Sequence, residues 1–241
     1  MKRNKIPAAA ILRLSIYYRY LQRLLQNGTT VVSSAALARY ANVNPAQLRK
    51  DLSYFGRFGV RGIGYDVVRL AEHIRGILGL VREWRMALVG VDCVGRALLA
   101  NRHLQSQGYR FVAAFDNDPK KVGEDVGHGL KIRPMEEFEE IVNADTVDIG
   151  VIAVSVDQAQ SVANAFVKAG VRGILNFAPT RLDLPGNIMV QYVDFTVLLD
   201  SLAYGICNLT KIEDEKKACI LDPRRQRWNR EHSWPVVQFF Q

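Results

Sequence analysis

The chain has 241 residues, 49% of them hydrophobic and 23% charged, a composition typical of globular proteins that excludes disordered and fibrous ones. At roughly 100 to 200 residues per domain, this length predicts two domains. The only early apolar run, residues 6–12, is broken by Pro7 and is too short for a signal peptide or a membrane helix, so we expect no membrane association and a cytoplasmic location.

The charge of the chain is distributed unevenly along it. The net charge is +8, but residues 1–85 hold 15 Lys and Arg against 4 Asp and Glu, and the remaining residues hold 17 against 20. Such segregation indicates a polyanion-binding module attached to a near-neutral one. A solvated charged face on an ordinary domain is the alternative.

The cysteines give no sign of a disulfide framework or a zinc site. Cys93, Cys207 and Cys219 are an odd number, without C-x-x-C spacing and without paired histidines nearby. We expect a reducing compartment and no bound metal.

The first third of the chain carries three helical patterns. Apolar residues recur at helical spacing over residues 7–26 until Asn27-Gly28 supplies a stop. Ser33-Ser34 can cap a short second helix, and Asn44-Pro45 can begin a third over residues 45–54. The short turn at residues 42–44 joins them, so the segment is predicted to be a helix-turn-helix.

The third predicted helix has a polar face opposite its apolar stripe. Arg pairs bidentately with guanine and Gln with adenine, whereas Lys and Tyr reach phosphates, so this face suits the major groove of DNA. Many helical hairpins share the pattern, which makes it only moderately specific. The polar face consists of Gln47, Arg49, Lys50, Ser53 and Tyr54.

Residues 56–65 are rich in glycine and have the pattern of a hairpin wing. Glycines permit tight turns, and Arg57 and Arg61 lie near the tips, where they could enter a narrow minor groove. A flexible glycine loop between domains is the alternative.

A strand-turn-helix pattern follows a connecting helix over residues 66–80. The strand at residues 86–89 leads into Gly90-Val91-Asp92-Cys93-Val94-Gly95 and then a helix over residues 96–105. In this context a G-x-G-x-x-G loop holds a pyrophosphate on backbone N–H groups. The next strand, residues 111–115, ends in Asp116, 21 residues after Gly95, where a ribose-binding carboxylate belongs.

Position 92 departs from this pattern because Asp replaces the middle glycine. A carboxylate about 4 Å from a phosphate is repelled by roughly 4 kcal/mol at an effective dielectric constant of about 20. We therefore expect Asp92 to weaken dinucleotide binding and Asp92→Gly to strengthen it at least about tenfold. For the neighbouring Cys93, at the start of the predicted helix, a small buried core cysteine is the favoured interpretation, and a direct thiol redox role is the alternative.

The remaining pattern alternates strands and helices. Strands at residues 148–154 and 173–177 flank a helix at 158–168, which predicts an α/β fold with a Rossmann-type, doubly wound parallel sheet after the N-terminal winged-helix module. A late helix at residues 197–206 is predicted to pack on its own domain or on a partner. The predicted division is residues 1–80, 81–195, a C-terminal helix at 196–210 and a polar tail at 211–241.

Several blocks resemble the Rex family of redox-sensing transcriptional repressors. They are residues 14–20, 47–56, 61–65, 113–116, 173–179 and 193–194, and the resemblance extends over about residues 6–206. It implies a homodimer with an exchanged C-terminal helix, a repressor bound to an inverted-repeat DNA operator, and release when NADH replaces NAD.

The resemblance also implies roles for individual residues. It implies NAD(H) contacts from residues 90–95, Asp116, Asn176 and Phe177, and a charge pair between Arg19 and Asp194 that couples the two halves. Asn101 stands where the family has a tyrosine near the nicotinamide. This difference adds to the expected weakening of NAD(H) binding.

Three functions stay open on the sequence alone: a repressor that responds to NADH and NAD, a repressor whose Rossmann domain only dimerises or binds another ligand, and an NAD-dependent oxidoreductase. The enzyme is disfavoured because the sequence offers no nucleophile-base or metal constellation near the loop. The histidines are scattered, at His73, His103, His128 and His232. We expect no catalytic activity.

Overall fold

The computed structural model describes residues 6–60 and 62–221, without the side chains of residues 210–221. The chain divides between Arg82 and Glu83 into two compact units, which we call the N-terminal unit and the sheet unit. This boundary lies close to the predicted one after residue 80. No helix in the described part of the chain is long and apolar enough to cross a membrane.

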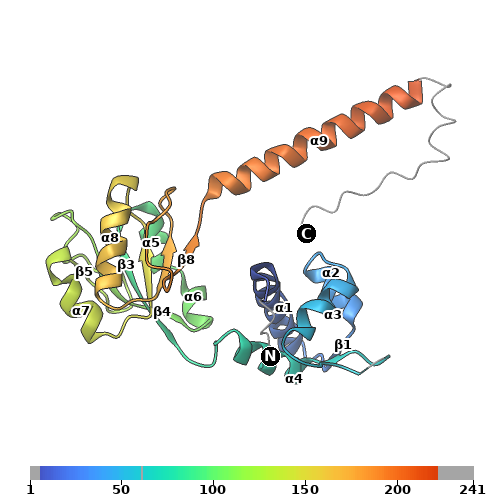
Figure 1. Cartoon of the computed structure of the whole chain (residues 1–241), viewed down its shortest axis with the longest axis horizontal. Coiled ribbons are helices and arrows are strands. Elements are labelled where there is room, and N and C mark those ends of the chain that lie inside the picture. Colours follow the sequence, from blue (N-terminus) through green and yellow to red (C-terminus); the bar gives the residue numbers. More distant parts are fainter. Residues whose placement is uncertain (1–5, 61, 222–241) are drawn as a thin grey trace. The chain divides into compact units, whose positions relative to one another are not determined.

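The N-terminal unit combines helices with a small antiparallel sheet (Figure 1). The predicted caps are confirmed, because the Ser33 hydroxyl accepts from the Ala36 N–H at 3.1 Å and the Asn44 side chain accepts from the Gln47 N–H at 2.8 Å. The elements are α1 (Ala8–Gln26), β1 (Val31–Val32), α2 (Ser34–Tyr40), α3 (Pro45–Ser53), β2 (Tyr65–Asp66) and α4 (Val67–Ile77).

The predicted wing lies between α3 and β2. Strand β2 pairs with β1, Val32 opposite Tyr65, and a bridge between Val60 and Gly64 closes the turn. Gly64 has a φ of 109°, and a Cβ there would collide with the Val32 carbonyl, so this turn requires glycine. Arg61 lies outside the described residues.

The core of the N-terminal unit forms where α1, α3 and α4 meet. Their inward residues recur at helical spacing, so the three helices bury one continuous apolar cluster. Asp51 is the exception, a fully buried carboxylate on α3. The central members are Leu14, Tyr17 and Leu21 on α1, Leu48 and Leu52 on α3, and Leu70 and Ile74 on α4.

The sheet unit contains a six-stranded parallel sheet in the order β5-β4-β3-β6-β7-β8. After β3 the chain moves outward to β4, then returns to place β6 on the other side of β3, as a doubly wound Rossmann-type sheet requires. The strands are β3 (Trp84–Val89), β4 (Tyr109–Phe115), β5 (Ile132–Arg133), β6 (Ile149–Ile152), β7 (Gly173–Asn176) and β8 (Met189–Tyr192).

Helices cover both faces of this sheet, as Figure 1 shows. Strand β3 alternates between the faces, since Ala87 and Val89 pack with α7 and α8 whereas Met86 and Leu88 pack with α5 and α6. The predicted α/β class is confirmed. The helices are α5 (Cys93–Leu99), α6 (Arg102–Ser106), α7 (Phe138–Ala144, after a 3-10 turn at Met135–Glu137), α8 (Val156–Lys168) and α9 (Phe195–Leu221).

The predicted helix over residues 96–105 is wrong as a single element. The chain forms α5 and α6 instead, and Asn101 begins α6 by accepting a hydrogen bond from the His103 N–H at 3.0 Å. Asparagine caps helices well, so it favours a new start over continuation. The late helix begins close to the predicted position and continues to Leu221.

Candidate functional site

Helix α3 presents the polar face that the sequence predicts. Arg49, Lys50 and Ser53 are exposed, and Tyr54 is half-buried at the C-terminal end. The Ser53 hydroxyl donates to the Lys50 carbonyl at 2.7 Å. Arg57, in the following loop, is also exposed. This surface offers cationic donors to a polyanion.

Gln47, the first residue of the predicted reading face, forms a hydrogen bond within the N-terminal unit. Its amide nitrogen donates to the Asp51 carboxylate at 2.8 Å. The side chain is half-buried, so its contact with a base would require exchange of this partner.

Asp51 is the centre of a buried polar cluster that sequence patterning missed. Besides Gln47, it accepts a hydrogen bond from the Tyr17 hydroxyl at 2.9 Å and pairs through both oxygens with Arg13. Burial raises the pKa of Asp51, but the hydrogen bonds from Arg13, Gln47 and Tyr17 outweigh it and hold the pKa below its usual value. The carboxylate therefore stays charged and ties α3 to α1.

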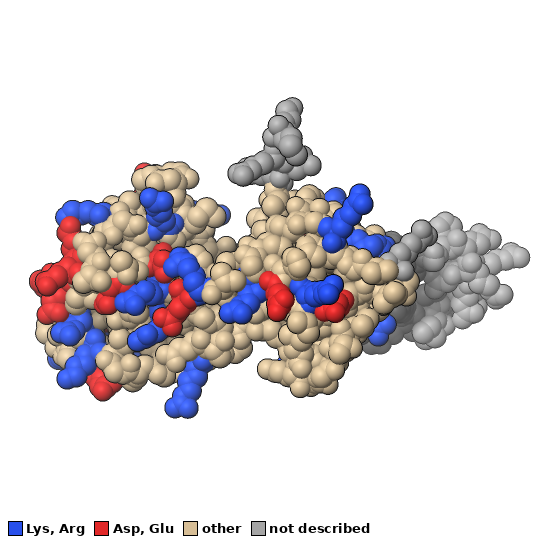
Figure 2. Space-filling view, turned by 90° about the horizontal axis from the view of Figure 1, so that it is seen from below, with Lys and Arg blue, Asp and Glu red and all other residues tan. Residues whose placement is uncertain are grey.

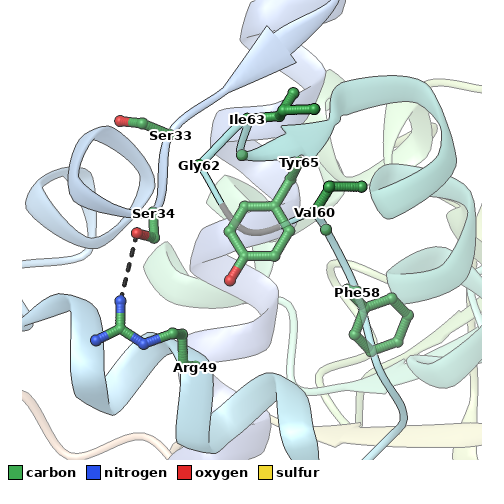
Figure 3. A pocket seen from close by; sticks show the side chains of 10 residues that line it. Ser33, Ser34, Arg49, Phe58, Val60, Gly62, Ile63 and Tyr65 are labelled. Atoms are coloured by element: carbon green, nitrogen blue, oxygen red, sulfur yellow. Dashed lines mark hydrogen bonds between the residues drawn. The ribbon is translucent and has the colours of Figure 1, made fainter.

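An open pocket of about 560 Å³ lies between the N-terminus of α2, helix α3 and the wing. Figure 3 shows the Arg49 guanidinium pointing toward Ser34, whose hydroxyl lies 3.5 Å away, with Val60 and Ile63 on the wing. The Tyr65 ring lies between Arg49 and the wing residues (Figure 3). The pocket is thus lined by hydroxyls, one guanidinium and apolar wing residues.

The two units differ in surface charge. Figure 2 shows acidic and basic side chains intermixed over the sheet unit and mostly basic ones over the N-terminal unit in this view. The distribution agrees with the excess of Lys and Arg in residues 1–85. The observed surface matches the predicted polyanion-binding module.

The glycine-rich loop lies where β3 ends, at the point where the strand order reverses. A Cβ at Gly90 would collide with the Ala153 carbonyl after β6, and a Cβ at Gly95 would collide with the Gly90 carbonyl. Both glycines are therefore required by close packing. Asp92 has an extended backbone, with φ −92° and ψ −158°, so position 92 needs no glycine for its own conformation.

Asp116 lies at the end of β4, beside this loop. Its carboxylate accepts from the Val91 N–H at 2.8 Å and from the Asp118 N–H at 2.9 Å. Although burial raises the pKa of Asp116, these bonds and Lys121 lower it overall. The predicted ribose carboxylate is therefore ionised and lies directly against the predicted phosphate loop.

Lys121 is a residue of this site that sequence reasoning missed. Its ammonium group lies 3.0 Å from Asp116 and also pairs with Asp92. The Lys121 side chain is 19% exposed and that of Asp92 is 73% exposed. Lys121 belongs to the loop after β4, and no local pattern indicates that this loop returns to position 92.

A second ion pair joins the same two segments. Arg96 on α5 binds Glu124 through both carboxylate oxygens, one at 2.7 Å. Both side chains are exposed. The loop after β4 is therefore attached to α5 independently of Lys121.

The remaining predicted cofactor residues lie at the start of α5 and at the end of β7. Val94 and Cys93 are exposed at the start of α5, so the expectation of a buried core cysteine is wrong. Asn176 is buried, and its amide is bonded to the backbone of Ala178 and Thr180, a role in shaping the chain after β7. The Phe177 ring lies 6.5 Å from that of Phe195.

The two predicted coupling residues lie in different units. Arg19 is exposed on α1. Asp194 precedes α9 and accepts from the Thr196 N–H at 2.9 Å and the Thr196 hydroxyl at 2.6 Å, which lowers the pKa of Asp194. Within the described chain, Asp194 therefore acts as a helix cap.

Among the described residues, no group of three or more His, Cys, Asp or Glu side chains could hold a metal ion. The described surfaces offer cationic donors on α3, and backbone N–H groups beside a paired carboxylate at the glycine-rich loop.

Comparison with known proteins gives matches for both units. The family model described as "Putative DNA-binding protein N-terminus" matches residues 5–53, and the one described as "CoA binding domain" matches residues 81–180. The "Redox-sensing transcriptional repressor Rex" of Syntrophobacter fumaroxidans is 50% identical over 206 residues, which cover 86% of this chain and 98% of that protein.

Solved structures match over both units as well. The structure described as "RSP in complex with beta-NAD+ and operator DNA" has a TM-score of 0.80 at 29% identity and covers 89% of this chain and 98% of its own. The structure of RSP "in complex with beta-NADH" has a TM-score of 0.78 at 29% identity, covering 89% and 99%.

Proposed function

Since the chain belongs to the Rex family of redox-sensing transcriptional repressors, we propose that its N-terminal unit reads an operator and that its sheet unit binds NADH and NAD. One observation carries this proposal: an exposed basic helix face and a glycine-rich loop beside an ionised Asp116 occur in one chain that matches a Rex repressor over nearly its whole length.

For the DNA interface, we propose that α3 enters the major groove. Arg49 would contact a base edge and Lys50 the DNA backbone, since both side chains are exposed. Ser53 and the half-buried Tyr54 would also contact the backbone, Ser53 by exchanging the Lys50 carbonyl for a phosphate. Gln47 could reach a base only by leaving Asp51. The wing, with Arg57 and Arg61, would lie over the adjacent minor groove.

The residues of the sheet unit fit a dinucleotide. The closely packed Gly90 and Gly95 place the backbone N–H groups of residues 92–95 at the switch point of the sheet, where a pyrophosphate is held in this fold, whereas the Val91 N–H is bonded to Asp116. Asp116 would accept from ribose hydroxyls. The bound NADH or NAD would supply the redox signal, and the chain would convert it into a change in operator affinity.

A second candidate is a repressor whose sheet unit binds NAD(H) weakly. Two observations favour it: Asp92 stands at the loop position that a pyrophosphate approaches, and Asn101 caps α6 where the family has a tyrosine. Under this alternative the sheet unit would serve dimerisation or another ligand.

We propose that a second copy of the chain covers α9, so that the repressor is a homodimer. The helix exposes many large apolar side chains, each more than half accessible, and such exposure to water is unfavourable. A two-fold dimer also suits an inverted-repeat operator. The exposed residues are Phe195, Val197, Leu198, Leu199, Leu202, Tyr204, Ile206 and Leu209.

We propose no enzymatic reaction for this site. The residues around the glycine-rich loop include no paired nucleophile and general base among the described side chains. A repressor acts where the chromosome lies, so we place the protein in the cytoplasm.

The test uses the full-length chain. Selection from random duplexes should enrich an inverted repeat, and gel-shift titration should then show weaker binding with NADH than with NAD. Absence of any preferred duplex would contradict operator reading. A preferred duplex whose affinity ignores both nucleotides would favour the second candidate.

A further inference from the structure

The loop at the candidate dinucleotide site carries a carboxylate together with a built-in counter-charge. Asp92 projects into solvent from an extended backbone, so the residue is tolerated sterically but adds negative charge where a pyrophosphate approaches. Lys121 pairs with that same carboxylate and with Asp116. A carboxylate in contact with an ammonium group repels a phosphate far less than an isolated one, because the field of an ion pair falls off faster with distance.

We propose that Lys121 is a charge-compensating residue that acts through Asp92 and permits NADH to bind to a loop bearing that carboxylate. This inference rests on the proposed function of the sheet unit. It assigns to Lys121 a role in binding that depends on the residue at position 92.

A role confined to folding does not account for the Asp92–Lys121 pair. Lys121 is already bonded to Asp116 within its own loop, and Arg96–Glu124 independently attaches that loop to α5. The Asp92 carboxylate is 73% exposed, and an exposed ion pair contributes little to stability. The compensation also persists at neutral pH, because contact with Asp92 raises the pKa of the Lys121 ammonium further above its usual alkaline value.

The test is a double-mutant cycle in the full-length protein. Calorimetry measures NADH affinity for the wild type, Lys121→Met, Asp92→Asn and the double variant. We expect Lys121→Met to weaken NADH binding at least about tenfold in the wild-type background and less than about threefold in the Asp92→Asn background. Lys120→Met is the matched control: it removes the same charge from the neighbouring exposed position and should change affinity less than about threefold.

Other results would contradict the role of Lys121, reveal a folding defect, or contradict NADH binding itself. An equal loss in both backgrounds would mean that Lys121 contacts the ligand or supports the fold directly, and it would overturn the inference, as would no loss in either. Melting temperatures of the ligand-free variants identify a folding defect, which would appear in both proteins that carry Lys121→Met. If none of the four proteins binds NADH, Asp92→Asn included, the proposed function of the sheet unit itself fails, and the inference with it.

Discussion

Arg13 on α1 and Asp51 on α3 form a bidentate ion pair, with the Arg13 Nε and Nη2 atoms 2.6 and 2.8 Å from the two oxygens of Asp51. The Asp51 side chain is fully buried and that of Arg13 is 18% exposed. The pair fixes the helix that carries the reading face to the first helix of the unit.

Removal of Arg13 should therefore lower the unfolding free energy of the protein substantially. Arg13→Ala leaves a buried carboxylate without its counter-charge, and we expect a loss of about 3 kcal/mol of unfolding free energy. Arg39→Ala, at an exposed position on α2, should change it by less than about 0.5 kcal/mol. Urea unfolding measures both, and equal effects of the two substitutions would contradict the structural role of the pair.

The same carboxylate predicts a pH dependence of stability. Because the folded-state pKa of Asp51 lies below the unfolded value of about 3.9, its contribution is fully present above about pH 4 and is lost as the pH falls through the folded-state value. The stability difference between wild type and Asp51→Asn should accordingly shrink as the pH falls below about 4. A difference that is constant with pH would show that the charge of Asp51 contributes nothing.

Two neighbouring residues on α3 should affect DNA binding differently. Arg49→Ala should cost about 1 to 3 kcal/mol in specific binding and relax base preference at one position, whereas Lys50→Ala should weaken all duplexes similarly and reduce the salt dependence. Gel-shift titrations of specific and random duplexes at several salt concentrations distinguish the two. Unchanged affinity in both variants would rule out α3 as the reading helix.

Asp194 allows capping to be separated from charge coupling. Asp194→Asn keeps an oxygen that can accept from the Thr196 N–H but loses the charge, whereas Asp194→Ala loses both. If a charge pair with Arg19 couples the units, both substitutions should change operator affinity and its response to NADH. Wild-type operator affinity in the Asn variant, with a changed melting temperature in the Ala variant alone, would assign Asp194 to capping.

The ion pair with Lys121 lowers the effect expected of Asp92→Gly. The isolated carboxylate predicts at least about tenfold tighter NADH binding on substitution, but a paired carboxylate repels less, so we expect a gain of less than about tenfold. Calorimetry on the two proteins side by side measures the gain. A gain well above tenfold would mean that Lys121 does not neutralise Asp92 in the bound state.

Local signals in the sequence predicted the helix starts, since the caps at Ser33 and Asn44 act within three residues. The strand-loop-helix around Gly90 and the exposed α3 face were predictable for the same reason. The Asp51 cluster was not, because apolar periodicity does not distinguish a buried carboxylate from an exposed one. Lys121 and Asp92 are 29 residues apart, so their contact depends on a loop path that no local pattern encodes.

Asp66 is both the last residue of strand β2, which follows the wing, and the N-cap of helix α4. Asp66 ends β2, opposite Val31 on β1, and its side chain accepts the Arg69 N–H at 2.8 Å as the cap of α4. Val67, the first residue of α4, donates its N–H to the Thr30 carbonyl at 2.9 Å. No residue separates β2 from α4, so there is no flexible linker between them. A rotation of α4 about its own axis would therefore move β2, and the wing that precedes it, together with the helix.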